Sequence, residues 1–157
     1  MWGRRDPAPA LPITHASRPA WRGGQCCYSP VAPVIPRLVL ATAAVLFAAF
    51  GMAFAAAPHR LAAMVDLPLP TSTATADFVA TYGGFEIGFA VFLFSCLARP
   101  ERVRLGLLAS GWAVAGFAIA RGAAILVLGH VKPVMYYALL LETVSAATAF
   151  LAAARAR

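Results

Sequence analysis

The stretch from residue 105 to residue 128 reads LGLLASGWAVAGFAIARGAAILVL, and Arg121 is the only charged residue in it. An α-helix rises ~1.5 Å per residue, so about 20 apolar residues cross the ~30 Å hydrocarbon layer of a membrane. Three further runs have the same character. The sequence therefore predicts an all-α fold, an integral membrane four-helix bundle, with spans at 38–57, 78–98, 105–128 and 134–154.

The overall composition supports this fold class. Of the 157 residues, 61% are hydrophobic and 12% are charged, whereas a soluble domain usually carries about 25% charged residues. The net charge of +7 does not indicate nucleic-acid binding, because the basic residues flank the apolar runs instead of clustering along one face. No nucleophile–base constellation or phosphate-binding loop is present, so nothing in the sequence favours an enzyme or a cofactor.

Residues 1–36 differ from the rest of the chain. They contain Pro7, Pro9, Pro12, Pro19, Pro30, Pro33 and Pro36, which are most of the chain's 12 prolines. Proline at this density blocks helix propagation, so we expect a disordered tail, or an upstream extension of the reading frame. The four-helix domain then covers 37–157, with a loop at 59–77.

The first span has an alternative interpretation. Arg37, an apolar run and the triplet Ala53-Phe54-Ala55 resemble a cleaved signal peptide. The long preceding tail and the full spanning length favour a retained span.

Orientation follows from the Lys and Arg residues near the span ends, since cytoplasmic loops keep the excess. One side carries only Arg60 and Lys132. The other carries Arg4, Arg5, Arg18, Arg22, Arg37, Arg99, Arg102, Arg104, Arg155 and Arg157. We therefore expect both termini on the cytoplasmic side of the membrane.

Three ionisable residues lie inside the predicted spans. Counted from the outer ends of their helices, Glu86 and Glu142 lie at a depth of ~12 Å and Arg121 at ~10 Å. A lone charge near the bilayer centre costs about 2.5–3.5 kcal/mol on insertion scales, and one guanidinium can serve two carboxylates. The sequence therefore predicts a buried Glu-Arg-Glu layer, which either fixes helix packing or forms a binding or proton-handling site.

Helix packing and outer-side residues complete the candidates. Gly84 and Gly88 form a G-x-x-x-G pair that permits close helix approach, and Gly83 lies beside Glu86. The polar candidates on the outer side are Tyr82, His59, His130 and Tyr136. The two histidines have no evident third ligand, so we expect no metal site. Among Cys26, Cys27 and Cys96, the last is expected to be a packing residue.

Three motifs carry a resemblance to a known family: Tyr82-Gly83-Gly84-Phe85-Glu86, Ala120-Arg121-Gly122, and Glu142. Over residues 38–154 the chain resembles the bacterial domain of unknown function 4345 family. The resemblance implies a four-helix membrane protein in which the Gly-Gly, Arg and Glu positions matter, and it brings no activity or cofactor. The turn at 129–133 lacks the acidic residue that the resemblance leads one to expect there.

Two functions stay open at this point. One is a structural or accessory helical bundle in the lipid bilayer. Its partner would be a second copy of the chain or another membrane protein. The other is a small carrier or proton-linked transporter that uses the charged layer as an oligomer. An intramembrane enzyme ranks last, because no nucleophile is evident.

Overall fold

The computed structural model describes residues 34–156, and over this part of the chain it contains helices and turns without a strand. The elements are α1 (Val34–Ala56), α2 (Pro58–Met64), α3 (Ser72–Phe78), the π-helical η1 (Val79–Gly84), α4 (Phe85–Leu97), the 3₁₀ turn η2 (Pro100–Arg102), α5 (Val103–Leu128) and α6 (Pro133–Arg155). Four helical stretches are long and apolar enough to cross a membrane: Val34–Ala56, Ser72–Leu97, Pro100–Leu128 and Pro133–Arg155.

The helix ends differ from the expected spans at two places. α1 begins at Val34, so residues 34–36 of the expected tail are helical; the rest of that prediction lies outside the described residues. Pro36 fits the first turn because the amides there have no partner within the helix. The expected loop at 59–77 instead contains α2, with Pro58 as its first residue, and α3.

The second long helix starts early because Thr71 caps it. Thr71 has an extended backbone, and its hydroxyl oxygen accepts a hydrogen bond from the Ala74 amide at 3.1 Å. A threonine in this position satisfies one of the amides that a helix start leaves without a partner. From this cap, α3, η1 and α4 continue as one helix across Ser72–Leu97.

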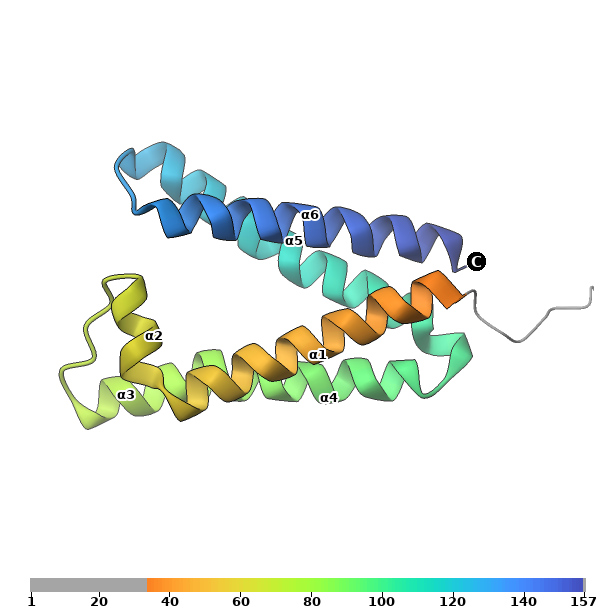
Figure 1. Ribbon diagram of the computed structural model, residues 1–157, viewed down its shortest axis with the longest axis horizontal. Helices are drawn as coiled ribbons and strands as arrows, with labels where there is room; N and C mark the ends of the chain where they lie inside the picture. Colours follow the sequence, from red (N-terminus) through yellow and green to blue (C-terminus); the bar gives the residue numbers. More distant parts are fainter. Residues whose placement is uncertain (1–33, 157) are drawn as a thin grey trace, which may run out of the picture.

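The long helices form two arms in a V (Figure 1). In the first arm, α1 packs along η1 and α4; in the second arm, α5 packs along α6. The arms meet where α1 and α5 begin and where α4 and α6 end, and they diverge toward α2, α3 and the α5–α6 turn. We call these the closed end and the open end.

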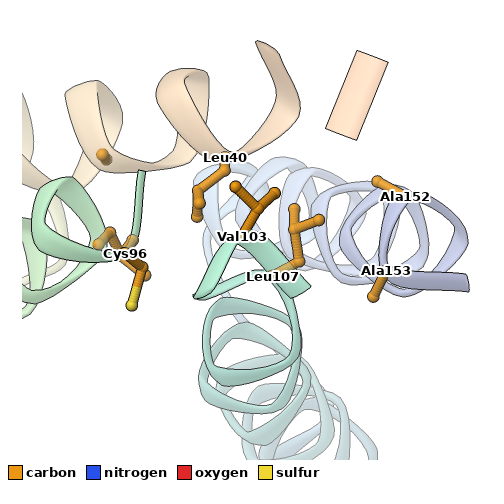
Figure 2. Close-up of a cluster of buried hydrophobic side chains, with 8 residues drawn as sticks. Leu40, Cys96, Val103, Leu107, Ala152 and Ala153 are labelled. Carbon is orange, nitrogen blue, oxygen red and sulfur yellow. The ribbon is translucent and has the colours of Figure 1, made fainter. Parts of the chain in front are cut away.

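The hydrophobic core lies at the closed end. Figure 2 shows side chains from α1, α4, α5 and α6 gathered there: the cluster consists of Leu40, Ala44, Leu93, Cys96, Val103, Leu107, Ala152 and Ala153. Gly106 allows α5 to approach closely, since a Cβ at this position would lie 2.9 Å from Cys96 Cβ and 2.9 Å from Leu40 Cδ1. Cys96 is a buried packing residue, as its place in an apolar run predicts.

Glycine also sets the packing within the first arm, at Gly83, which is one of the three expected glycines, and at Gly51, which was not expected. A Cβ on Gly51 of α1 would lie 2.8 Å from Ile87 Cγ1, and one on Gly83 would lie 3.2 Å from Ala55 Cβ. Gly88 has no atom within 4 Å of such a Cβ, and Gly84 meets only the Val79 carbonyl at 3.9 Å. The G-x-x-x-G pair therefore makes no close helix contact within the described chain, and Gly51 with Gly83 makes one instead.

Candidate functional site

An ion pair joins Arg121 of α5 to Glu142 of α6. Arg121 Nε donates to both carboxylate oxygens, at 3.1 and 3.0 Å, and Nη2 donates to Oε1 at 2.7 Å. The side chains of Arg121 and Glu142 are 28% and 17% exposed. Two helices that are consecutive in the chain are thus tied together by a forked, charge-assisted contact, the geometry for which arginine is suited.

Glu86 does not join this pair, so the expected three-residue layer is wrong. No hydrogen bond or ion pair in residues 34–156 connects Glu86 to Arg121 or Glu142. No charged side chain in these residues is fully buried; Ser110 is the one buried polar residue among them. Glu86 belongs to the first arm and the other two to the second arm. Equal depth along the helices does not imply contact where the arms diverge (Figure 1).

Glu86 nevertheless has an unusual environment. Its Oε2 atom is shielded from solvent and has no hydrogen-bond partner among the described residues. Buried polar atoms are normally paired, and an exception in a helix of this apolar character requires an explanation. Glu86 follows directly after η1, in the first turn of α4.

The π-helical segment η1 is the feature that sequence reasoning missed. π-helical turns are rare and occur frequently at functional sites. The Gly83-Gly84 pair was the available signal, since two glycines weaken α-helix propagation. Within η1, Tyr82 packs against Phe78 and Phe54, with ring centroids 4.7 and 5.7 Å apart.

Arg121 lines an open groove of about 530 Å³ at the open end of the V. One wall comes from the residues that follow α2, Val65 and Asp66. The other wall comes from α5, the α5–α6 turn and the start of α6: Phe117, Ala120, Arg121, Ala124, Ile125, Leu128, His130, Val131, Lys132 and Met135. The groove is therefore mostly apolar with a few polar groups, as ligand sites usually are.

A second ion pair crosses the mouth of this groove. Lys132 Nζ of the α5–α6 turn donates to Asp66 Oδ1 at 2.6 Å, and the two side chains are 49% and 67% exposed. Asp66 has a positive φ of 57°, a conformation that Asp tolerates better than most residues. This solvent-exposed contact links the open ends of the two arms.

The two histidines among the outer-side candidates lie in different grooves. His59 lines a separate shallow groove with Thr71 and Thr75, whereas His130 lines the groove of Arg121. Residues 34–156 hold no group of three or more His, Cys, Asp or Glu that could bind a metal ion. Tyr136 is exposed in the first turn of α6.

The family assignment rests on a match over nearly the whole described chain. The family model described as Domain of unknown function (DUF4345) matches residues 35–153. The chain belongs to this family. The DUF4345 match includes η1, Glu86, Arg121 and Glu142, and it starts within the first turn of α1. Comparison with curated proteins and with solved structures gives no match.

Proposed function

We propose that the protein is inserted in the bacterial inner membrane with both termini in the cytoplasm. The four apolar helices support insertion. So do large hydrophobic side chains that are exposed on α5, among them Leu126 at 86% and Val127 at 83%, since exposed apolar surface of this kind normally contacts lipid or a partner. The arginine-rich ends of the helices would then lie at the closed end, on the cytoplasmic side, and the groove would open outward.

Thiol labelling in whole cells tests this orientation. In a chain whose native cysteines are replaced by serine, Pro68→Cys reports on the loop before α3 and Arg102→Cys on η2. A membrane-impermeant maleimide should label Pro68→Cys in intact cells and Arg102→Cys only after permeabilisation. The reverse pattern would contradict the orientation, and labelling of both in intact cells would contradict the insertion.

Within the membrane, the proposed role is that of a structural or accessory helical bundle. The observation that carries this proposal is the forked Arg121–Glu142 contact. It satisfies two ionisable groups that would otherwise be costly in an apolar layer, and it does so between neighbouring helices. An ion pair between α5 and α6 stabilises the second arm. The exposed apolar face of this arm remains available to a partner in the membrane.

Charge-removing substitutions test the structural role of the pair. Arg121→Gln and Glu142→Gln should each destabilise the fold by roughly 2–3 kcal/mol, because each leaves one partly buried charge without its partner. The double variant should recover most of that loss. Thermal unfolding of the full chain in detergent measures the effect, with the exposed Glu101→Gln as control. Equal stability of all variants would contradict the structural role.

A small proton-linked carrier is the second candidate, and the unpartnered Oε2 atom of Glu86 favours it. An intramembrane carboxyl group without a fixed partner is suited to bind and release a proton. In vesicles with an imposed pH gradient, the protein should then carry protons, and Glu86→Gln should abolish the flux without loss of folding. A strict monomer in mild detergent would count against a carrier, since four helices leave little room for a path.

A further inference from the structure

The groove at the open end is an open hollow lined mainly by apolar side chains. Its volume of about 530 Å³ falls within the ~300–1,000 Å³ of typical ligand pockets. Phe117 and Leu128 line it while remaining 44% and 69% exposed. The apolar lining of the groove is therefore accessible from outside the protein.

Arg121 has hydrogen-bonding capacity left over in this groove. A guanidinium carries five N–H donors, and Glu142 occupies the Nε and Nη2 edge. Nη1 has only the Met135 Sδ atom as partner, at 3.1 Å, and a thioether sulfur is a weak acceptor. Because Arg121 and Met135 both line the groove, a better acceptor placed there would replace the sulfur at Nη1.

The charges around the groove indicate an uncharged ligand. Glu142 balances Arg121, and Asp66 balances Lys132. An anionic ligand would compete with Glu142 for the guanidinium. A cationic ligand would find no free carboxylate among the described residues that line the groove, because Asp66 is paired with Lys132. A neutral oxygen acceptor does not compete with Glu142, and it can accept a hydrogen bond from the N–H groups on Arg121 Nη1.

The depth of Arg121 distinguishes between neutral acceptors. This step rests on the membrane insertion proposed above, which places Arg121 ~10 Å below the outer end of α5 at helical rise. The ester carbonyls of a glycerolipid are held near the interface by their headgroup. A small apolar molecule with a carbonyl group is not held there and can reach this depth.

We propose that the groove binds an uncharged, membrane-dissolved carbonyl compound, whose oxygen accepts a hydrogen bond from Arg121 Nη1 and whose apolar body lies along Ala120, Ala124 and Leu128. The structural role of the Arg121–Glu142 pair is independent of this occupant, since the pair uses the other edge of the guanidinium.

Photolabelling with an alkyl-substituted benzophenone tests the proposal, because this probe is itself a neutral ketone that inserts into nearby C–H bonds on irradiation. With the full chain in lipid nanodiscs, labelling should be saturable and should map to the groove, Met135 included. An excess of a non-photoreactive alkyl ketone should compete. Alkyl carboxylates and alkylammonium ions of equal length should compete at least about tenfold less well. Labelling that does not saturate, or that spreads evenly over lipid-facing helices, would overturn the proposal.

Matched variants separate the groove from the lipid surface. Ala124→Trp fills the groove and should abolish saturable labelling, whereas Ala123→Trp, next to it on α5 but outside the groove, should not. Ala120→Phe serves in its place if Ala124→Trp fails to fold. Arg121→Lys keeps the charge opposite Glu142 but loses Nη1, and should weaken binding about tenfold or more. Unchanged binding in Ala124→Trp or in Arg121→Lys would overturn the proposal that the groove is the binding site. Thermal stability and thiol labelling of Ala124→Trp should match the parent chain, so loss of binding is distinguishable from failure of the proposed fold or topology.

Discussion

At the scale of single residues, Arg121 shows how one side chain can serve two purposes. Its Nε–Nη2 edge is held by Glu142, while Nη1 remains beside the weakly accepting sulfur of Met135. Lysine could supply the charge but not two separate donor edges. Glu86 has no such partner among the described residues, so Glu86 and Glu142 have different environments and, we infer, different roles.

The Thr71 cap gives a prediction at the same scale. Thr71→Ala should destabilise the start of α3 by about 1 kcal/mol, because the Ala74 amide loses the side-chain oxygen that it donates to. Hydrogen exchange of the amides in Ser72–Phe78 should become faster, while α5 and α6 stay unchanged. Thr73→Ala is the control, since Thr73 is exposed and caps nothing. Equal exchange in both variants would show that the cap does not contribute.

At the scale of elements, the first arm depends on a close backbone approach between α1 and η1. The π-helical turn shifts the positions that face α1, so that Gly83 contacts Ala55 and Gly51 contacts Ile87. Gly84 and Gly88, which have the familiar spacing, point away from that contact. A G-x-x-x-G pattern describes a regular α-helix, and η1 interrupts that regularity.

Alanine substitutions at Gly51 and Gly88 should therefore change the stability of the protein in opposite directions. Gly51→Ala should destabilise the protein by roughly 1–3 kcal/mol, since the new Cβ would lie 2.8 Å from Ile87 Cγ1 and 2.9 Å from its backbone nitrogen. Gly88→Ala has open space and should raise stability by up to about 1 kcal/mol through helix propensity. Thermal unfolding in detergent measures both. A destabilising Gly88→Ala would instead indicate that this face packs against another copy or partner.

At the scale of the whole molecule, the V combines a packed closed end with a loosely linked open end. The core side chains Leu40, Leu93 and Leu107 are completely buried at the closed end, whereas at the open end the Asp66–Lys132 pair bridges the two arms. Since α1 contributes to this core, removal of the first span by signal cleavage would expose it.

Lys132→Ala should widen the distribution of distances between the arms. The pair is exposed and contributes about 1 kcal/mol or less, so the change should affect the spread of conformations more than the overall stability. Pulsed electron resonance between spin labels at positions 63 and 127 measures the distances. High salt should widen the distribution of the parent chain but not of Lys132→Ala, and Lys132→Arg should behave like the parent. A distribution that Lys132→Ala leaves unchanged would show that other contacts hold the arms.

Part of this structure was predictable from local sequence because the physical cause is local. The positions of the four apolar helices follow from runs of about 20 residues that each hold at most one charged residue, since only a helix satisfies its own backbone in an apolar layer. The family followed from short motifs around Glu86, Arg121 and Glu142, and the match over residues 35–153 confirms it. The pairing of Arg121 with Glu142 was also accessible, because α5 and α6 are consecutive and a short turn makes them neighbours.

The tertiary structure alone decided which of the other helices meet. Depth along a helix can be counted from the sequence, but the lateral distance between helices depends on how small residues such as Gly51 and Gly106 let backbones approach. That packing joins the arms at the closed end and separates Glu86 from Arg121 at the open end. The run at 105–128 thus determined by itself that α5 is an apolar helix carrying one arginine. The divergence of the arms, which arises from packing between residues far apart in the chain, determined that this arginine holds one carboxylate and lines a groove.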